Sequence, residues 1–153
     1  MSYACISVDS PVGRLWIVEK ENAIVRLTWR EREETAPTDL LEDAADQLGK
    51  YFAGELQNFE LPLNPAGGDF QQKVHQAMLE IPYGETQTYG DIAEKISGAA
   101  QPVGTACGRN PIPVIIPCHR VVAAKNLGGF SGEGGIETKI QLLRLENAIP
   151  YLI

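Results

Sequence analysis

The chain has few residues of the kinds that build metal centres and disulfide frameworks. It contains three cysteines, Cys5, Cys107 and Cys118, and two histidines, His75 and His119. No C-x-x-C pair occurs, so a structural zinc site is not expected. An odd number of widely spaced cysteines argues against a disulfide framework and for a reducing compartment. We therefore expect no bound metal and a cytoplasmic protein.

Long apolar runs and an excess of positive charge are also missing. No apolar stretch approaches the roughly 20 residues that cross a bilayer, and no signal-peptide pattern opens the chain, so no membrane partner is expected. The formal net charge of −7 speaks against nucleic acid as a partner. However, residues 1–69 hold 13 acidic and 6 basic residues, whereas residues 70–153 hold 7 of each. The back half has no basic stripe, but as a whole it would not repel a polyanion.

The front half shows strand and helix patterns and no candidate for chemistry. Strand-sized segments separated by turn residues occupy residues 3–8, 14–19 and 23–29. Their short connections favour an antiparallel meander. Apolar residues between 40 and 52 recur at helical spacing and predict an amphipathic helix that ends at Gly54. Residues 59–63 are a candidate for one more strand.

The stretch NPAGGD, residues 64–69, is the best candidate for a domain boundary. It predicts an N-terminal domain over 1–66, with a structural or regulatory role, and a C-terminal domain over 67–153. Asp69 can cap a helix that carries a set of apolar residues on one side: Phe70, Val74, Ala77, Met78 and Ile81. Near the end of the chain, residues 136–148 predict a further amphipathic helix.

Two short helices joined by a turn are predicted between these two. Thr88 and Asp91 have the spacing of a capping box. Residues 101–110 then predict a second helix, with Pro102 at its first position, and the pair matches a helix-turn-helix. Glycine, alanine and cysteine make the second helix smooth over residues 104–108. Either another molecule approaches this backbone closely, or a neighbouring helix packs tightly on it, and the pattern does not choose between them.

Cys118 and His119 are adjacent within IIPCHRVV, residues 115–122. A cysteine reacts as its thiolate, and a nearby base raises the ionised fraction. Neighbours on an extended strand face opposite sides, and three prolines are expected to keep this backbone extended up to Cys118. The two side chains could therefore be linked through a water, with Glu146 orienting the imidazole. A pair that only packs in the core is the alternative, because no protease signature and too few metal ligands accompany it.

Four blocks of the back half, in order, resemble the O6-alkylguanine-DNA alkyltransferases, also called methylated-DNA–protein-cysteine methyltransferases. They are FQQKVHQAMLEIPYGETQTYGDIA, VGTACGRNPIPVIIPCHRVV, GGFSG and KIQLLRLE, within about residues 70–147. The resemblance implies an α+β fold. A small N-terminal antiparallel-sheet domain with a helix, ribonuclease H-like, would precede a helical, winged helix-turn-helix-like domain.

The resemblance also implies DNA repair by a protein that acts once. The partner would be double-stranded DNA that carries O6-alkylguanine, or O4-alkylthymine, contacted through the minor groove with the damaged base flipped out. A monomer would transfer the alkyl group irreversibly to Cys118, without a metal or organic cofactor.

Roles for individual residues follow from the same resemblance. Cys118 would accept the alkyl group, His119 would deprotonate it through a water, and Glu146 would orient His119. Asn110 would brace the active-site turn, and Arg120 would be structural, in a salt bridge. The residues implied to contact DNA or the flipped base are Tyr89, Gly90, Gln101, Val121, Ala124, Phe130 and Ser131.

Three of these positions depart from the family pattern. Gln101 replaces the usual arginine that fills the space of the flipped nucleotide, Phe130 replaces a tyrosine, and Ala124 replaces a phosphate-contacting serine. These departures predict weak DNA binding or an altered substrate.

Three hypotheses therefore remain: a repair alkyltransferase, a lesion-binding relative without transfer activity, and a regulatory module with Cys118 as a sensor. The joint presence of the five residues that carry the chemistry favours the first hypothesis: Tyr89, Asn110, Cys118, His119 and Glu146.

Overall fold

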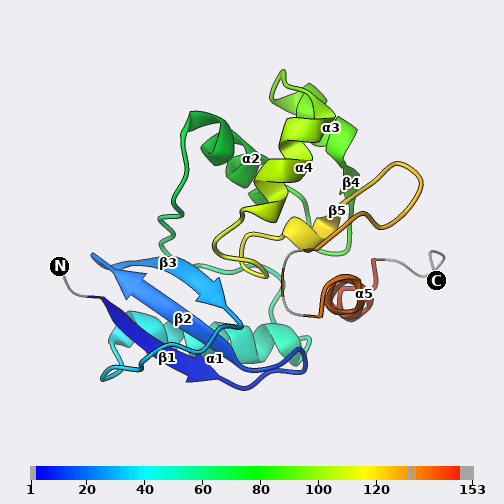
Figure 1. Ribbon diagram of the computed structural model, residues 1–153. Coiled ribbons are helices and arrows are strands. Elements are labelled where there is room, and N and C mark those ends of the chain that lie inside the picture. The colour runs from blue at the N-terminus through cyan, green and yellow to red at the C-terminus, as the bar shows by residue number, and fades with distance from the viewer. Residues whose placement is uncertain (1–2, 131, 133, 149–153) are drawn as a thin grey trace. The chain divides into compact units, whose positions relative to one another are not determined.

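The computed structural model describes residues 3–130, 132 and 134–148. The chain divides into two compact units, Met1–Ala66 and Gly67–Ile153. In Figure 1 the first unit runs from blue to cyan-green and the second from green to red. A sheet with one helix forms the first unit, and helices dominate the second, so the expected α+β class is confirmed. No helix in these ranges has the length and apolar character needed to span a membrane.

The first unit contains the predicted antiparallel meander. Its strands are β1 (Ala4–Val8), β2 (Leu15–Lys20) and β3 (Ala23–Thr28), paired in the order β1-β2-β3. Glu21 and Asn22 connect β2 to β3 with φ values of 53° and 65°. Two left-handed residues suit the right-handed twist of adjoining strands, which explains the tight hairpin.

Helix α1 (Asp39–Phe52) packs on β1 and β2. The Thr38 hydroxyl caps it by accepting a hydrogen bond from the amide of Leu41 at 3.1 Å. The predicted strand over 59–63 is wrong, because only an isolated parallel bridge joins Leu63 to Ile24. Pro62 offers a carbonyl to the Ile24 amide but has no N–H to extend a ladder.

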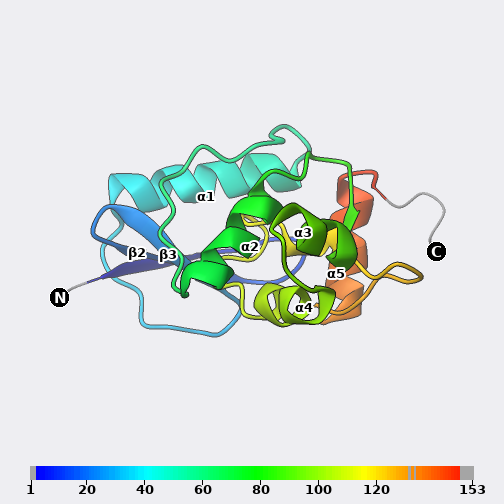
Figure 2. The ribbon, with the colours of Figure 1, turned by 90° about the horizontal axis from the view of Figure 1, so that it is seen from above.

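Within its described residues, the second unit consists mainly of four α-helices. They are α2 (Asp69–Leu79), α3 (Tyr89–Lys95), α4 (Ala100–Gly108) and α5 (Ile136–Leu145). Figure 2 shows α2, α3 and α4 close together, and all three pairs are in contact. A short parallel pair, β4 (Gln87–Thr88) with β5 (Val121–Val122), and a 3₁₀ turn, η1 (Cys118–Arg120), complete the unit.

The ends of two helices differ from the sequence predictions. Gly68, not Asp69, is the N-cap of α2, and Phe70 is 39% exposed instead of facing the core. Helix α4 begins at Ala100, so Pro102 is its third residue and not its first. Proline is tolerated there because amides of the first helical turn have no partner within the helix.

The predicted capping box at the start of α3 is confirmed. The Thr88 hydroxyl accepts from the Asp91 amide at 3.0 Å, and the Asp91 carboxylate accepts from the Thr88 amide at 2.9 Å. This reciprocal pair fixes the first turn of α3 and therefore the place of Tyr89, the first residue of the helix.

Replacement of Thr88 by alanine should destabilise the protein, because the amide of Asp91 then loses its acceptor. We expect a loss of about 1 kcal/mol in the free energy of unfolding, measured by urea titration. Thr88→Ser, which keeps the hydroxyl, should remain within a few tenths of a kcal/mol of the unmodified protein. Equal losses in the two variants would contradict a capping role.

Candidate active site

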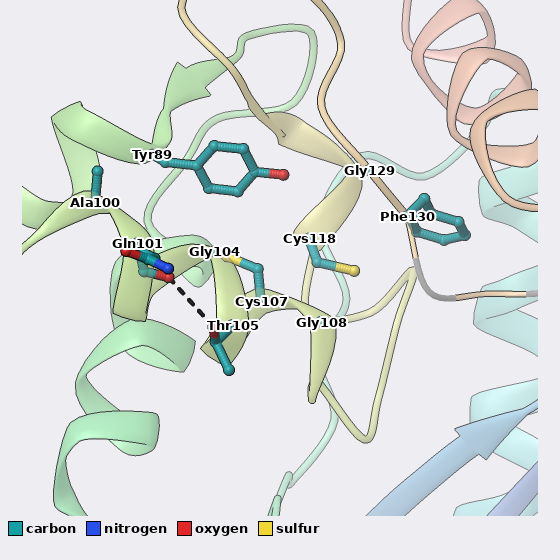
Figure 3. Close-up of a pocket in the computed structure, with 10 residues that line it drawn as sticks. All are labelled: Tyr89, Ala100, Gln101, Gly104, Thr105, Cys107, Gly108, Cys118, Gly129 and Phe130. Atoms are coloured by element: carbon teal, nitrogen blue, oxygen red, sulfur yellow. Dashed lines mark hydrogen bonds between the residues drawn. The ribbon is translucent and has the colours of Figure 1, made fainter.

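A cavity of about 700 Å³ lies between α4, the start of α3, η1 and the segment around Gly129. Figure 3 shows the side chains that line it and the Cys118 side chain extending toward Phe130. The lining residues are Tyr89, Ala100, Gln101, Gly104, Thr105, Cys107, Gly108, Cys118, Gly129 and Phe130. None of them is an Asp, Glu, Lys or Arg, so the cavity suits an uncharged, partly apolar ligand.

The smooth side of α4 forms one wall of this cavity. Gly104 and Gly108 lie one helical turn apart on it, together with Ala100 and Thr105. A Cβ added at Gly108 would meet no atom within 4 Å, and one added at Gly104 would only touch the Tyr89 ring at 3.9 Å. Tight helix packing therefore does not explain these small residues. The alternative, an open face that another molecule can approach closely, fits the geometry.

The segment before Cys118 coils tightly instead of running extended, which corrects the sequence prediction. Val114 has a left-handed φ of 73°, and the amide of Ile116 donates to the carbonyl of Ile112 at 2.8 Å. Asn110 fastens the coil, because its Nδ2 donates to the Ile116 carbonyl at 2.8 Å and its Oδ1 accepts from the Ile112 amide at 3.0 Å. The Asn110 amide therefore satisfies two backbone groups of a segment whose prolines cannot donate backbone hydrogen bonds.

Cys118 is 6% exposed and opens η1. Burial raises the pKa of its thiol, while Asn110 and the Lys139 ammonium act in the opposite direction. Lys139 is fully buried, and its Nζ donates to the carbonyls of Val121 at 2.6 Å and Gly129 at 2.9 Å. Burial lowers the pKa of Lys139 to about 8, although the two thiols nearby act to raise it. The resting thiol is therefore mainly protonated, and a buried cation lies near enough to favour its ionised form.

His119, Arg120 and Glu146 form a buried cluster behind Cys118. Nε2 of His119 is 2.7 Å from Oε2 of Glu146, and Nε of Arg120 is 2.8 Å from Oε1. Burial acts to raise the pKa of Glu146, but hydrogen bonds from His119 and Arg120 lower it to about 2. Burial lowers the pKa of His119 despite the Glu146 carboxylate. The imidazole is therefore neutral and donates its Nε2 proton to Glu146.

This arrangement leaves Nδ1 of His119 as the basic nitrogen. Nδ1 is buried and has no hydrogen-bond partner within the part of the chain that the structure describes. η1 turns the backbone between Cys118 and His119, so the two side chains are not forced to opposite faces as on a strand. No direct hydrogen bond is found between the Cys118 sulfur and His119 among these residues, which leaves a water-linked arrangement open.

Family models match both units of the chain. Residues 69–148 match the DNA binding domain of 6-O-methylguanine DNA methyltransferase, and residues 1–65 match the ribonuclease-like domain of the same protein. The chain belongs to the 6-O-methylguanine DNA methyltransferase family. The resemblance drawn from four sequence blocks is thereby confirmed, and it extends to the front half, whose own sequence pattern carried little of it.

Individual relatives are similar to this member of the methyltransferase family over nearly their whole length. The methylated-DNA–protein-cysteine methyltransferase of Mycobacterium tuberculosis is 45% identical over 152 residues, which cover 93% of this chain and 91% of the relative. The constitutive enzyme of that name from Bacillus subtilis is 41% identical, and the match covers 92% of this chain and 93% of the relative.

Solved structures agree with these relatives. The crystal structure of the Mycobacterium tuberculosis O6-methylguanine methyltransferase has a TM-score of 0.85 at 41% identity, covering 96% of this chain and 94% of that one. The structure of Mycobacterium tuberculosis OGT in complex with DNA has a TM-score of 0.83 at 44% identity, covering 95% and 92%.

The positions expected to contact DNA or the flipped base fall into two groups. Tyr89, Gln101 and Phe130 line the cavity. Burial raises the pKa of Tyr89, and its hydroxyl lies so close to Gly128 that a Cβ there would approach it to 2.7 Å. Tyr89 is therefore a wall of the cavity and is not simply a core aromatic.

The other four positions lie outside the cavity lining or outside the described residues. Gly90 on α3 and Ala124 in the loop after β5 are exposed. Val121 is fully buried in β5 and does not line the cavity. Ser131 is outside the described residues, so its predicted contact with the base stays a prediction.

Two residues of the site were missed in the sequence. Lys139 stands on the apolar side of α5, and a lysine at such a position signals a buried cation. Cys107 lines the same cavity, and burial together with Cys118 raises the pKa of its thiol to about 12. No cluster of three or more candidate metal ligands is found in the described ranges.

Replacement of Glu146 by glutamine should remove a stabilising charge whose effect depends on pH. Because the folded-state pKa of about 2 lies below the ordinary value of 4.5, ionised Glu146 favours the fold above pH 4.5. This contribution is lost as the pH falls toward 2. We expect Glu146→Gln to cost roughly 3–5 kcal/mol at pH 7, since it leaves Arg120 buried without its anion.

Urea unfolding at a series of pH values measures this difference. The stability of the unmodified protein should approach that of Glu146→Gln as the pH is lowered from 4.5 toward 2. Glu34→Gln, on an exposed carboxylate of the first unit, serves as the control and should show little change. A gap between Glu146→Gln and the unmodified protein that stays constant with pH would exclude the assigned titration.

Proposed function

We propose that this protein repairs DNA by transferring an alkyl group from O6 of guanine to Cys118, once per molecule. One observation carries the proposal: Cys118 borders an uncharged cavity whose opposite wall is the smooth face of a helix-turn-helix. An alkylated guanine is neutral and aromatic, so it suits such a cavity better than a charged ligand does. A base inside a duplex cannot reach Cys118 and must be flipped out of the stack.

The transfer is a displacement at the alkyl carbon. The Cys118 thiolate attacks this carbon, the new S–C bond forms, and the C–O bond to guanine breaks. The electron pair of that bond returns to the base, which takes up a proton from the Tyr89 hydroxyl. The Tyr89 phenolate then regains a proton from solvent, and the imidazolium of His119 releases the thiol proton to solvent. The thioether cannot revert to a thiol by this chemistry, so each molecule acts once.

His119 and Glu146 supply the base for Cys118. The thiol proton passes through a water to Nδ1 of neutral His119, and the resulting imidazolium is held by Glu146 through the 2.7 Å hydrogen bond. Burial raises the thiol pKa, so ionisation at rest costs free energy. The Lys139 ammonium and the Asn110 amide offset part of this cost at the sulfur. Arg120 keeps Glu146 ionised and takes no direct part in binding the guanine.

Residues 70–153 hold 7 acidic and 7 basic residues, so the part of the chain that would bind DNA lacks the excess of positive charge that DNA binding normally uses. Gln101 occupies the position at which the family pattern has an arginine, and it lies on the cavity wall beside Thr105. Glutamine can donate a hydrogen bond to an orphaned base but lacks the charge and the planar stacking surface of a guanidinium. Affinity for duplex DNA is therefore low for this fold.

The free state of Cys5, Cys107 and Cys118 favours a reducing compartment, so we place the protein in the cytoplasm. All groups assigned to the transfer come from one chain, so a monomer suffices. The ribonuclease-like domain of residues 1–66 has a structural or regulatory role and supplies no group to the reaction.

Intact-protein mass spectrometry tests the function directly. After incubation with a duplex that carries O6-methylguanine, the protein should gain the mass of one methyl group, and peptide mapping should locate it at Cys118. Cys118→Ser should gain none, whereas Cys5→Ser, in the other domain, should react like the unmodified protein. Unmodified Cys118 after prolonged incubation, with free O6-benzylguanine also unreacted, would favour the lesion-binding or sensor hypothesis.

Gln101→Arg should strengthen duplex binding, because it adds a cation on the wall of α4 that faces DNA. We expect affinity to rise and the slope of log K against log salt to steepen by about one unit. Fluorescence anisotropy at several salt concentrations measures both. Gln101→Leu controls for side-chain size, and the same affinity and slope in all three proteins would mean that α4 does not enter DNA.

A further inference from the structure

A chain of hydrogen bonds joins α2 to the last turn of α4 and has no part in the chemistry described above. Nε2 of Gln71 donates to the Ala106 carbonyl at 2.7 Å and lies 2.9 Å from Nε2 of His75. Gln71 and His75 are one turn apart on α2, and His75 is only 2% exposed. A buried histidine and a glutamine thus converge on one backbone atom of the neighbouring helix.

The donors and acceptors of this chain match only one arrangement. A glutamine amide nitrogen has two hydrogens, and the Ala106 carbonyl takes one of them. The second is taken by Nε2 of His75 when the imidazole is neutral with its proton on Nδ1, an atom that is buried and has no hydrogen-bond partner among the described residues. Burial lowers the pKa of His75 and so favours the neutral ring. If the amide turned over, its oxygen would face the Ala106 carbonyl oxygen, so that carbonyl fixes the orientation of Gln71, and Nε2 of His75 meets the remaining N–H.

Gly67 provides independent evidence that the place of Gln71 is specific. Gly67 has a φ of 140°, in the region that favours glycine, and a Cβ there would collide with the side chain of Gln71. The backbone before α2 therefore adopts a conformation that leaves room for this side chain. The place of the Gln71 side chain therefore requires glycine at position 67.

Ala106 lies close in sequence to the residues that line the cavity and hold Cys118, so a displacement of its backbone would also shift them. Its carbonyl is in the last turn of α4, where carbonyls lack intrahelical partners, and it also accepts from the Arg109 amide at 3.1 Å. Cys107 and Gly108, the next residues, line the cavity. Asn110 follows, and its side chain fastens the coil that ends at Cys118.

We propose that Gln71 and His75 are positioning residues for alkyl transfer, which hold the last turn of α4 against α2 and so keep Asn110 and the cavity wall in place around Cys118. The inference rests on the proposed function. Neither residue touches the base, and His75 acts only through Gln71.

Single-turnover kinetics with an O6-methylguanine duplex tests this role, because it separates duplex affinity from the transfer rate at saturation. Gln71→Leu should lower the transfer rate by roughly ten- to a hundredfold, the range expected for a displacement of up to 1 Å at a reacting group. Affinity should change much less. Gln72→Leu is the matched control, since Gln72 is the neighbouring exposed glutamine of α2 and its amide donates to the Gly67 carbonyl.

A double-mutant cycle tests whether His75 acts through Gln71. His75→Leu should slow transfer by itself but add nothing in a Gln71→Leu background. His75→Gln, which retains a neutral acceptor, should recover most of the rate lost in His75→Leu. Additive effects, equal losses of affinity and rate, or no recovery by His75→Gln would overturn the proposal.

A second readout separates failure of this inference from failure of the proposed function. If the unmodified protein transfers no methyl group, the proposed function fails, and the positioning role is then judged by thiol labelling. The rate at which iodoacetamide labels Cys107, followed by peptide mass spectrometry, should rise in Gln71→Leu and not in Gln72→Leu. Unchanged labelling would overturn the positioning role as well. If Gln71→Leu does not fold, as judged by circular dichroism, the comparison of His75→Leu with His75→Gln decides.

Discussion

The buried carboxylate of Glu146 is the interaction on which the rest of the site depends. It accepts hydrogen bonds from His119 and Arg120, and Arg120 also donates to the Ile81 carbonyl at 2.7 Å. One anion at the end of α5 thereby connects the turn that carries Cys118 to the end of α2. Burying this charge costs free energy that only the paired arrangement recovers. The cluster therefore has a single favourable geometry, and the imidazole has a single orientation within it.

The same burial that gives His119 a basic nitrogen makes the Cys118 thiol harder to ionise. The neutral imidazole presents as a base its Nδ1, which has no hydrogen-bond partner among the described residues. However, the burial that keeps His119 neutral also raises the pKa of Cys118. A resting thiol that stays protonated is protected from adventitious reaction. In the proposed transfer, ionisation is favoured by proton transfer to His119 and by the Lys139 ammonium, whose effect is largest when a bound base excludes water. A protein that acts once benefits from a thiol that does not react before its substrate arrives.

The cavity wall has a different physical basis. Helix α4 contributes its smooth face, and its orientation is set by α2 and α3, through the capping box at Thr88 and the amide of Gln71. Small residues that weaken a helix by themselves are tolerated on α4 because the neighbouring helices hold it. The same residues leave room for a nucleic acid backbone to approach. Stability lost within α4 is thus recovered from its packing, and the open face remains available.

Local patterns in the sequence determined most of the elements and the family to which the chain belongs. The meander, the helix over 39–52, the capping box at Thr88 and the family blocks around Cys118 all depend on short-range periodicity, on caps or on contiguous residues. Tertiary structure alone decided the coil before Cys118 and the burial of Lys139. It also decided that Val121 does not line the cavity and that Gln71 contacts α4. These features arise because a buried polar group must find a partner, and the partner is distant in the chain and invisible to any local pattern.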